Sequence, residues 1–178
     1  MKRHRHWISG AVLAGSAVLF YPGRDYVLVG LMLFLPLLDR AWKLPDLPRD
    51  KQRWAVSTGL ILTGVALLAW KPEHLSFGLA TLFLAALPEE WFFRAYFMTR
   101  VGQGWRANLA ASLLFSLLHG LTQGWPAAIR VFAPSLFFGW LYQRTGDLVL
   151  LILMHALSNL LFVMFLAGYL EEIYGKFL

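Results

Sequence analysis

The chain alternates between long apolar stretches and short polar connections. A helix that crosses a bilayer needs about 17 to 25 apolar residues, and shorter runs are accepted where turn residues flank them. The pattern therefore predicts an all-α fold, a polytopic transmembrane helical bundle of about seven helices, with roughly six to eight as the range. The predicted helices lie roughly at residues 7–21, 26–38, 54–70, 77–98, 107–125, 129–142 and 148–169.

Composition also indicates an integral membrane protein. Of the 178 residues, 58% are hydrophobic and only 15% are charged, which lies outside the range of ordinary soluble domains. No linker, charge block or internal repeat divides the chain, so residues 1–178 are expected to form one integral membrane domain with a motif-bearing core at about 77–169. The absence of cysteine excludes disulfides, thiolate nucleophiles and cysteine-based metal centres.

The net charge of +6 follows the predicted membrane topology rather than a nucleic-acid surface. Cations gather in the connections on one side of the predicted bundle, and the positive-inside rule makes that side cytoplasmic. We therefore expect a multi-pass protein of the cell inner (cytoplasmic) membrane, with a cytoplasmic N-terminus, an outward C-terminal tail and no nucleic-acid partner. The cytoplasmic cations are Lys2, Arg3, Arg5, Arg40, Lys43, Arg49, Lys51, Arg53, Arg100, Arg106 and Arg144, and the opposite ones are Arg24, Lys71, Arg130 and Lys176.

The N-terminal segment also resembles a signal peptide, because a basic start precedes an apolar run. The small residues Ala14, Gly15 and Ser16 lie inside that run rather than after it, which favours a retained first helix. His4 and His6 are interpreted as part of a basic arm at the lipid headgroups.

Ionisable and amide side chains lie inside three of the later apolar segments. Such groups are costly at membrane depth and indicate a functional site by default. At a rise of ~1.5 Å per residue, the first glutamate, both histidines and the asparagine fall ~11 to ~18 Å from the predicted cytoplasmic helix ends, in one layer. The residues are Glu89, Glu90 and Arg94 of the fourth segment, His119 of the fifth, and His155 and Asn159 of the seventh.

Helical periodicity predicts which of these side chains share a face. Residues four apart project together, which pairs Glu90 with Arg94 and His155 with Asn159. The fifth segment carries a single polar stripe, which must face protein or a hydrated cavity because hydrocarbon cannot satisfy its hydrogen bonds. The stripe consists of Asn108, Ser112, Ser116, His119 and Gln123.

Pro88 directly precedes the acidic pair and removes a backbone donor from the helix. Two interpretations stay open. The proline either makes an ordinary kink in a membrane helix, or it starts a new helical segment with Glu89 and Glu90 in the first turn, where the helix dipole favours carboxylates.

These side chains suit the activation of water. Glu90, one turn before Arg94, is placed to stay ionised in a buried ion pair. Glu89 points about 100° away and is available to accept a proton and return it. His119 is placed to share or orient the same water, and the histidine–asparagine pair of the seventh segment can donate hydrogen bonds to a developing oxyanion. Together these roles describe a water-activating peptidase site.

Three motifs occur in order on three apolar segments: Glu-Glu-x-x-x-Arg at 89–94, Phe115-x-x-x-His119 and His155-x-x-x-Asn159. They resemble the signature motifs of the CPBP family, which comprises CAAX endopeptidases and bacteriocin-processing relatives, also called glutamic-type intramembrane proteases. Each motif is weak singly and specific in combination.

The resemblance covers roughly residues 88–162 and implies an all-helical membrane endopeptidase without a metal or other cofactor. Its substrate would be a membrane-associated protein or peptide cut near one end, for instance at a C-terminal sorting or anchor segment. The family core usually has about eight helices, so this chain looks compact at its N-terminal end. By resemblance, Glu89 and His119 activate water, His155 and Asn159 stabilise the oxyanion, and Glu90 and Arg94 support the site.

Other functions are compatible with the same residues. Zinc accepts ligands such as Glu89, His119 and His155, although the chain lacks a His-Glu-x-x-His motif. A non-catalytic membrane-binding or immunity protein on the same scaffold is a second alternative, and a proton-coupled transporter is a third. The two pairs at four-residue spacing could also serve only to tie helices together.

Overall fold

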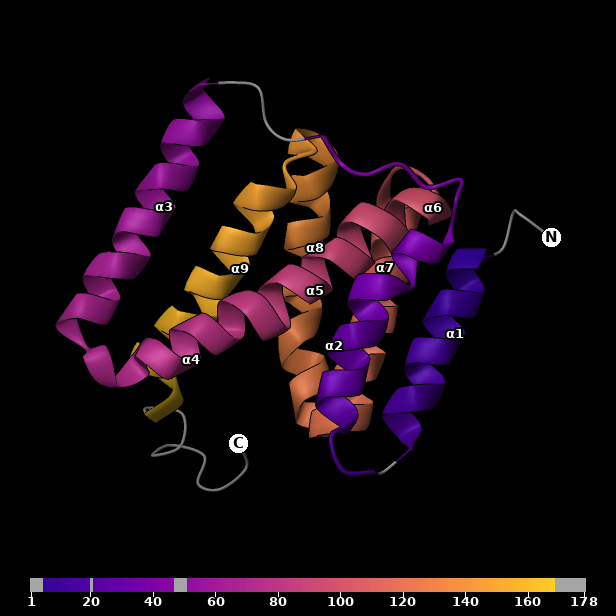
Figure 1. Ribbon diagram of the computed structural model, residues 1–178, viewed down its shortest axis with the longest axis horizontal. Helices are drawn as coiled ribbons and strands as arrows, with labels where there is room; N and C mark the ends of the chain where they lie inside the picture. The colour runs from indigo at the N-terminus through magenta and orange to yellow at the C-terminus, as the bar shows by residue number, and fades with distance from the viewer. Residues whose placement is uncertain (1–4, 20, 47–50, 169–178) are drawn as a thin grey trace. The chain divides into compact units, whose positions relative to one another are not determined.

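The computed structural model describes residues 5–19, 21–46 and 51–168 (Figure 1). Every regular element in these ranges is helical, which confirms the predicted all-α fold. The predictions made for the C-terminal tail and for Lys2, Arg3, His4, Arg49 and Lys176 fall outside the described residues.

The helices follow the predicted apolar segments. The sixth is longer than predicted, because Pro126 stands near its start and Gly146 (φ 63°) supplies the left-handed residue that ends it. Within the described ranges the segments are α1 (Arg5–Val18), α2 (Arg24–Phe34) with η2 (Pro36–Leu38), α3 (Lys51–Trp70) with η3 (Pro72–His74), a composite helix from α4 to α6, α7 (Trp105–Gln123), α8 (Trp125–Thr145), and α9 (Leu148–Leu161) with η6 (Phe162–Leu166).

The composite fourth helix changes its winding around the acidic pair. Two π-helical stretches flank the short α5, and the N–H of Leu87 donates to the carbonyl of Leu82, five residues back. The helix therefore continues through Pro88. Both carboxylates lie in the first turn of α5, but this turn is not a free helix start because η4 runs directly into it. The parts are α4 (Leu75–Ala80), η4 (Thr81–Ala86), α5 (Leu87–Glu90), η5 (Trp91–Met98) and α6 (Thr99–Val101).

The chain forms two compact units, each built from two stretches of sequence. The first unit contains Met1–Asp46 and Pro88–Leu148, and the second contains Leu47–Leu87 and Val149–Leu178. The acidic pair and His119 therefore belong to the first unit, whereas His155 and Asn159 belong to the second.

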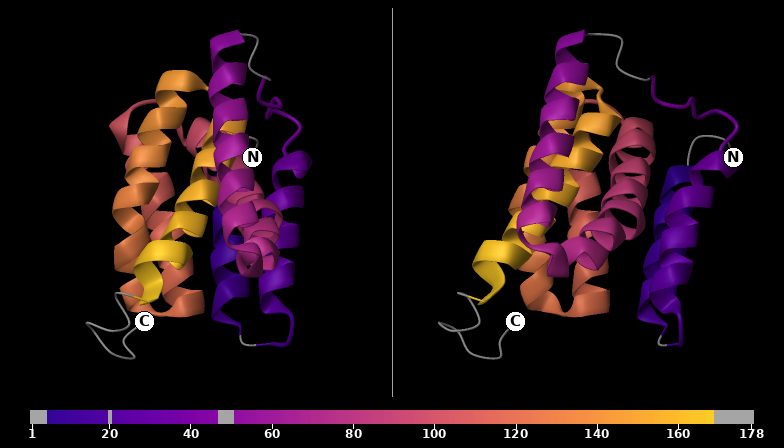
Figure 2. Two further views of the ribbon diagram at one scale, coloured as in Figure 1. Left: turned by 90° about the vertical axis from the view of Figure 1, so that its left-hand side faces the viewer. Right: turned by 60° about the vertical axis from the view of Figure 1, so that its left-hand side comes forward.

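The π-helix η5 lies at the centre of the first unit, with α1, α2, α7 and α8 packed around it. All its side chains from Phe92 to Met98 are buried. The surrounding helices form two antiparallel hairpins that turn at Gly23 (φ 77°) and Gly124 (φ 92°), where glycine accepts a left-handed backbone (Figures 1 and 2). The polar side chains of a helix that is buried on all sides must pair with other protein groups, because no water reaches them.

The segment up to Trp42 is anchored to η5 by side-chain bonds to backbone carbonyls. The indole N–H of Trp42 donates to the carbonyl of Ala95 at 2.8 Å, and that of Trp91 donates to the carbonyl of Leu33 at 3.2 Å. Such bonds satisfy carbonyl groups that are buried away from water. The segment before the motif helix thus stabilises the position of that helix.

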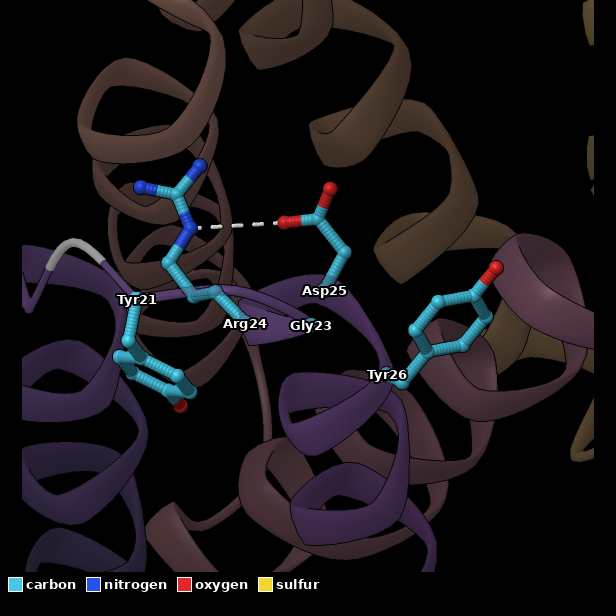
Figure 3. A pocket seen from close by; sticks show the side chains of 5 residues that line it. All are labelled: Tyr21, Gly23, Arg24, Asp25 and Tyr26. Atoms are coloured by element: carbon cyan, nitrogen blue, oxygen red, sulfur yellow. Dashed lines mark hydrogen bonds and ion pairs between the residues drawn. The ribbon is translucent and has the colours of Figure 1, made fainter.

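Arg24 ties the turn between α1 and α2 to α7. Its Nη1 donates to the carbonyl of Ala17 at 3.4 Å and its Nη2 to that of Thr122 at 3.3 Å. Both carbonyls lie near helix C-termini, where the helix dipole favours a cation. The side chains of Arg24 and Asp25 point toward each other (Figure 3), and Nε of Arg24 lies 3.4 Å from Oδ1 of Asp25. Both residues line a pocket of about 280 Å³.

The structure corrects the expectation for His6. This residue is buried in α1 and does not lie in an exposed arm. Its ring packs edge-on against Phe97, with 5.9 Å between centroids, and the neighbouring Ser9 hydroxyl lies 3.2 Å from that of Tyr96. The burial of His6 was not predicted because its neighbours in the sequence are cationic, although the buried face of α1 already begins at this residue. The stripe consists of His6, Ser9, Gly10, Leu13 and Ala17.

A close crossing joins α7 and α8. Asn108 donates from Nδ2 to the carbonyl of Leu136 at 2.8 Å, and its Oδ1 accepts from the Ser112 hydroxyl at 3.3 Å. Gly139 faces the Asn108 amide so closely that a Cβ added there would overlap it. Only glycine allows this approach of the two helices.

We expect Gly139→Ala to lower the free energy of unfolding by about 1–3 kcal/mol, because the methyl group overpacks the crossing and displaces Asn108 from Leu136. Gly64→Ala in α3 is the matched control, since nothing lies within 4 Å of a Cβ added there. SDS-induced unfolding of both purified variants, followed by circular dichroism, measures the difference. Equal stability of Gly139→Ala and wild type would contradict this packing.

Two helices of the described chain are long and apolar enough to cross a membrane: α3, with a mean hydropathy of 1.3, and the helix Leu148–Leu166, with 2.4. Only 6% of the apolar window of α3 is buried. Exposed apolar surface of this extent indicates a membrane or protein contact, and a helix of this length spans about 30 Å of hydrocarbon. That the other predicted segments also cross the membrane stays a prediction.

Candidate active site

The Glu90–Arg94 pair forms the buried centre of the first unit. Nε of Arg94 lies 3.3 Å from Oε2 of Glu90, and both side chains are 0% exposed. A buried charge requires a partner of opposite sign, because desolvation of an isolated ion costs several kcal/mol or more. The four-residue spacing supplies that partner within one helix.

Arg94 is also held by two neighbouring helices. Its Nη2 donates to Oγ of Ser135 at 2.9 Å and to the Ser135 carbonyl at 3.2 Å, both on α8. Its guanidinium carbon lies 5.1 Å from the ring centroid of Phe115 on α7, within the range of a cation–π contact. The ion pair therefore ties η5 to both helices of the α7–α8 hairpin.

Glu89 has a different environment from its neighbour. It lies in the same turn of α5, yet its side chain is partly exposed where Glu90 is fully buried. The two neighbouring acids therefore differ in their access to solvent.

His119 is oriented by the turn of α7 that precedes it. Its Nδ1 lies 3.0 Å from the carbonyl oxygen of Phe115. Because a carbonyl only accepts hydrogen bonds, this contact requires the imidazole tautomer that is protonated on Nδ1, in which Nε2 can act as an acceptor. The ring also packs on the Phe115 ring, with 4.4 Å between centroids. Phe115 thus contacts both His119 and Arg94.

The polar stripe of α7 is buried over most of its length. Asn108, Ser112 and Ser116 are buried, His119 is partly exposed, and Gln123 is exposed at the helix end. Gln123 is exposed because α7 ends at this residue. A residue on the buried face of a helix is still exposed where the helix has no neighbour to pack against.

The remaining two predicted residues lie on α9. His155 is buried, and Asn159, one turn later, is partly exposed. The Asn159 Nδ2 donates to the Thr81 hydroxyl at 2.9 Å. Across the part of the chain that the structure describes, no three His, Asp or Glu side chains gather as ligands for a metal ion. That Glu89, His119, His155 and Asn159 converge in one layer stays a prediction.

Comparison with known protein families bears directly on these motifs. Residues 69–161, more than half of the chain, match the family described as Type II CAAX prenyl endopeptidase Rce1-like. The chain belongs to this family. The matched region contains all three Rce1-like motifs, so the resemblance to the CPBP family is confirmed. No curated protein and no solved structure matched the chain.

Membership of the Rce1-like family implies a membrane protein with protease activity and with protein or peptide substrates. The family match begins at residue 69, so α1, α2 and nearly all of α3 precede it. Trp42 and Arg24 therefore lie outside the matched region, whereas their acceptors Ala95 and Thr122 lie inside it.

Sequence motifs did not reveal two polar partners of the candidate residues. Ser135 binds Arg94, and Thr81 binds Asn159, although neither lies in a motif. Ser135 directly follows Pro134 within α8. A polar residue next to a proline inside a helix is the one signal in the sequence that could have indicated Ser135. Thr81 carries no such signal, since threonines are common in membrane helices.

Proposed function

We propose that the chain is an intramembrane endopeptidase that hydrolyses a peptide bond near the end of a membrane-associated protein or peptide. Glu89 takes a proton from a water molecule as the water oxygen attacks the peptide carbonyl carbon. The same carboxyl group then returns the proton to the amide nitrogen, and the carbon–nitrogen bond breaks. His119 orients the water through Nε2.

The oxyanion that forms on the carbonyl oxygen would receive hydrogen bonds from His155 and Asn159. Donors held in place before the reaction stabilise this charge without reorganisation, and each is worth about 10²- to 10³-fold in rate. Their spacing on α9 places both on one face of that helix. In this scheme Glu90 and Arg94 act on the site only by holding η5 against α7 and α8.

The observation that carries this proposal is the bond between His119 and the Phe115 carbonyl. In the tautomer that makes this bond, Nδ1 is the donor and Nε2 is able to accept a hydrogen bond from water.

Substrate trapping tests the activity directly. Membranes that contain Glu89→Ala are expected to accumulate uncut precursors, which mass spectrometry of terminal peptides would detect by comparison with wild-type membranes. Glu73→Ala is the control, because Glu73 is an exposed acid outside the motifs. Identical terminal peptides in wild-type and Glu89→Ala membranes would overturn the protease assignment.

Chelation distinguishes this mechanism from the zinc alternative. The purified enzyme is expected to keep its full activity after dialysis against EDTA and 1,10-phenanthroline, because carboxylate and imidazole groups alone activate the water. Loss of activity on chelation, with recovery on addition of zinc, would favour ligation by Glu89, His119 and His155 instead.

A further inference from the structure

We propose that Thr81 positions the side-chain amide of Asn159 and thereby sets the direction of the hydrogen bond that this amide donates to the oxyanion. The proposal rests on the proposed function for the role of Asn159. The contact itself lies entirely within the second unit. It joins residues on two different helices, η4 and α9, with Nδ2 of Asn159 2.9 Å from Oγ1 of Thr81.

Thr81 is a rigid acceptor. Its side chain is buried, and it stands where the winding changes from α4 to the π-helix η4. Its backbone N–H is already bonded to the carbonyls of Phe77 and Gly78. A threonine in a helix is restricted to two main χ1 rotamers, and burial of the Thr81 side chain restricts the hydroxyl further.

The bond to Thr81 uses one of the two hydrogens on Nδ2 of Asn159. Because a primary amide is planar, fixing one N–H also fixes the plane and the direction of the second N–H. That second hydrogen remains for an acceptor such as a developing oxyanion. Without the threonine hydroxyl, the amide would rotate about its Cβ–Cγ bond and present donor and acceptor alternately.

The position of Asn159 increases the value of this restraint. The asparagine is only partly buried, so packing restrains its amide less than that of a core residue. The neighbouring His155 is buried one turn earlier. The hydrogen bond to Thr81 therefore orients Asn159, which is partly exposed, whereas burial restrains His155.

Kinetics of matched variants test the proposal. Thr81→Val keeps the shape of the side chain but removes the acceptor, and we expect it to lower kcat by roughly 10- to 100-fold, as small displacements of reacting groups do, with KM unchanged. Thr81→Ser keeps the hydroxyl and should recover most of the rate. In an Asn159→Ala background, Thr81→Val should cause no further loss of kcat.

Two results for Thr81→Val would overturn the role of Thr81. One is a Thr81→Val enzyme with wild-type kcat while Asn159→Ala is strongly impaired. The other is an equal loss of kcat from Thr81→Val with and without Asn159, which would indicate a general effect on the fold. If Asn159→Ala itself keeps full activity, the oxyanion role fails, and the positioning role fails with it.

A spectroscopic measurement tests the contact without any activity. The chain contains only two asparagines, Asn108 and Asn159, so selective ¹⁵N-asparagine labelling gives two side-chain amide groups in an NMR spectrum. Thr81→Val should shift the Asn159 pair and leave the Asn108 pair in place, and Thr81→Ser should restore it. Should the valine variant not fold, Thr81→Ala gives the same comparison. An unchanged Asn159 pair would overturn the contact even in a fully active protease.

Discussion

Glu89→Gln is expected to abolish most of the peptidase activity, with kcat reduced about 10²- to 10⁴-fold, the usual contribution of a general acid–base group. Glutamine has nearly the same shape as glutamate, but its amide cannot take a proton from water. KM should change little, because the substitution removes proton transfer rather than substrate contacts. Initial rates on a trapped substrate, measured in proteoliposomes, give both constants.

The matched control for this prediction is Glu73→Gln, which changes an exposed acid of η3 in the same way. It should hydrolyse the substrate at the wild-type rate. Circular dichroism of both variants verifies that the helices are intact. A folded Glu89→Gln variant with full biological activity would instead support a non-catalytic membrane-binding protein on the same scaffold.

Arg94→Met is expected to lower the free energy of unfolding by about 3–5 kcal/mol, because it leaves the Glu90 carboxylate buried without its cation. Both side chains are 0% exposed and 3.3 Å apart. The variant also loses the two bonds to Ser135 and the contact with Phe115. SDS-induced unfolding of the purified protein measures the loss.

The double variant Glu90→Leu/Arg94→Met distinguishes an unpaired charge from simple loss of packing. Removing both charges should recover most of the stability lost in Arg94→Met, since apolar replacement of a buried pair is often neutral or stabilising. Asp25→Asn serves as the control, because Asp25 is 82% exposed beside Arg24 and such pairs contribute about 0–1 kcal/mol. A double variant less stable than Arg94→Met would contradict the buried-charge explanation.

These two predictions distinguish a catalytic role of Glu89 from a stabilising role of the neighbouring Glu90. Glu89 and Glu90 are neighbours in the sequence, yet one is partly exposed and the other is fully buried against Arg94. The first substitution is therefore expected to change kcat with little effect on stability, and the second to change stability first. A shared role for the two acids would give similar losses of both quantities.

Local sequence was sufficient for the helices and for pairs within one helix. Apolar runs predicted all seven helical segments of the described chain, because helix formation depends on neighbours three and four residues apart. The same spacing paired Glu90 with Arg94 before any tertiary contact was considered. The boundaries of α8 and the buried face of α1 at His6 were missed, because caps and packing partners determine them rather than the apolar run itself.

By itself, the sequence determined the all-α class, the positions of the helices and the three motifs that place the chain in the Rce1-like family, because each depends on residues within one or two helical turns. Only the tertiary structure decided that Ser135 and Phe115 hold Arg94, that Asn108 packs on Gly139, and that Thr81 binds Asn159. These contacts join residues far apart in the chain, and helical periodicity gives the face on which a side chain lies but not the residue that it meets there.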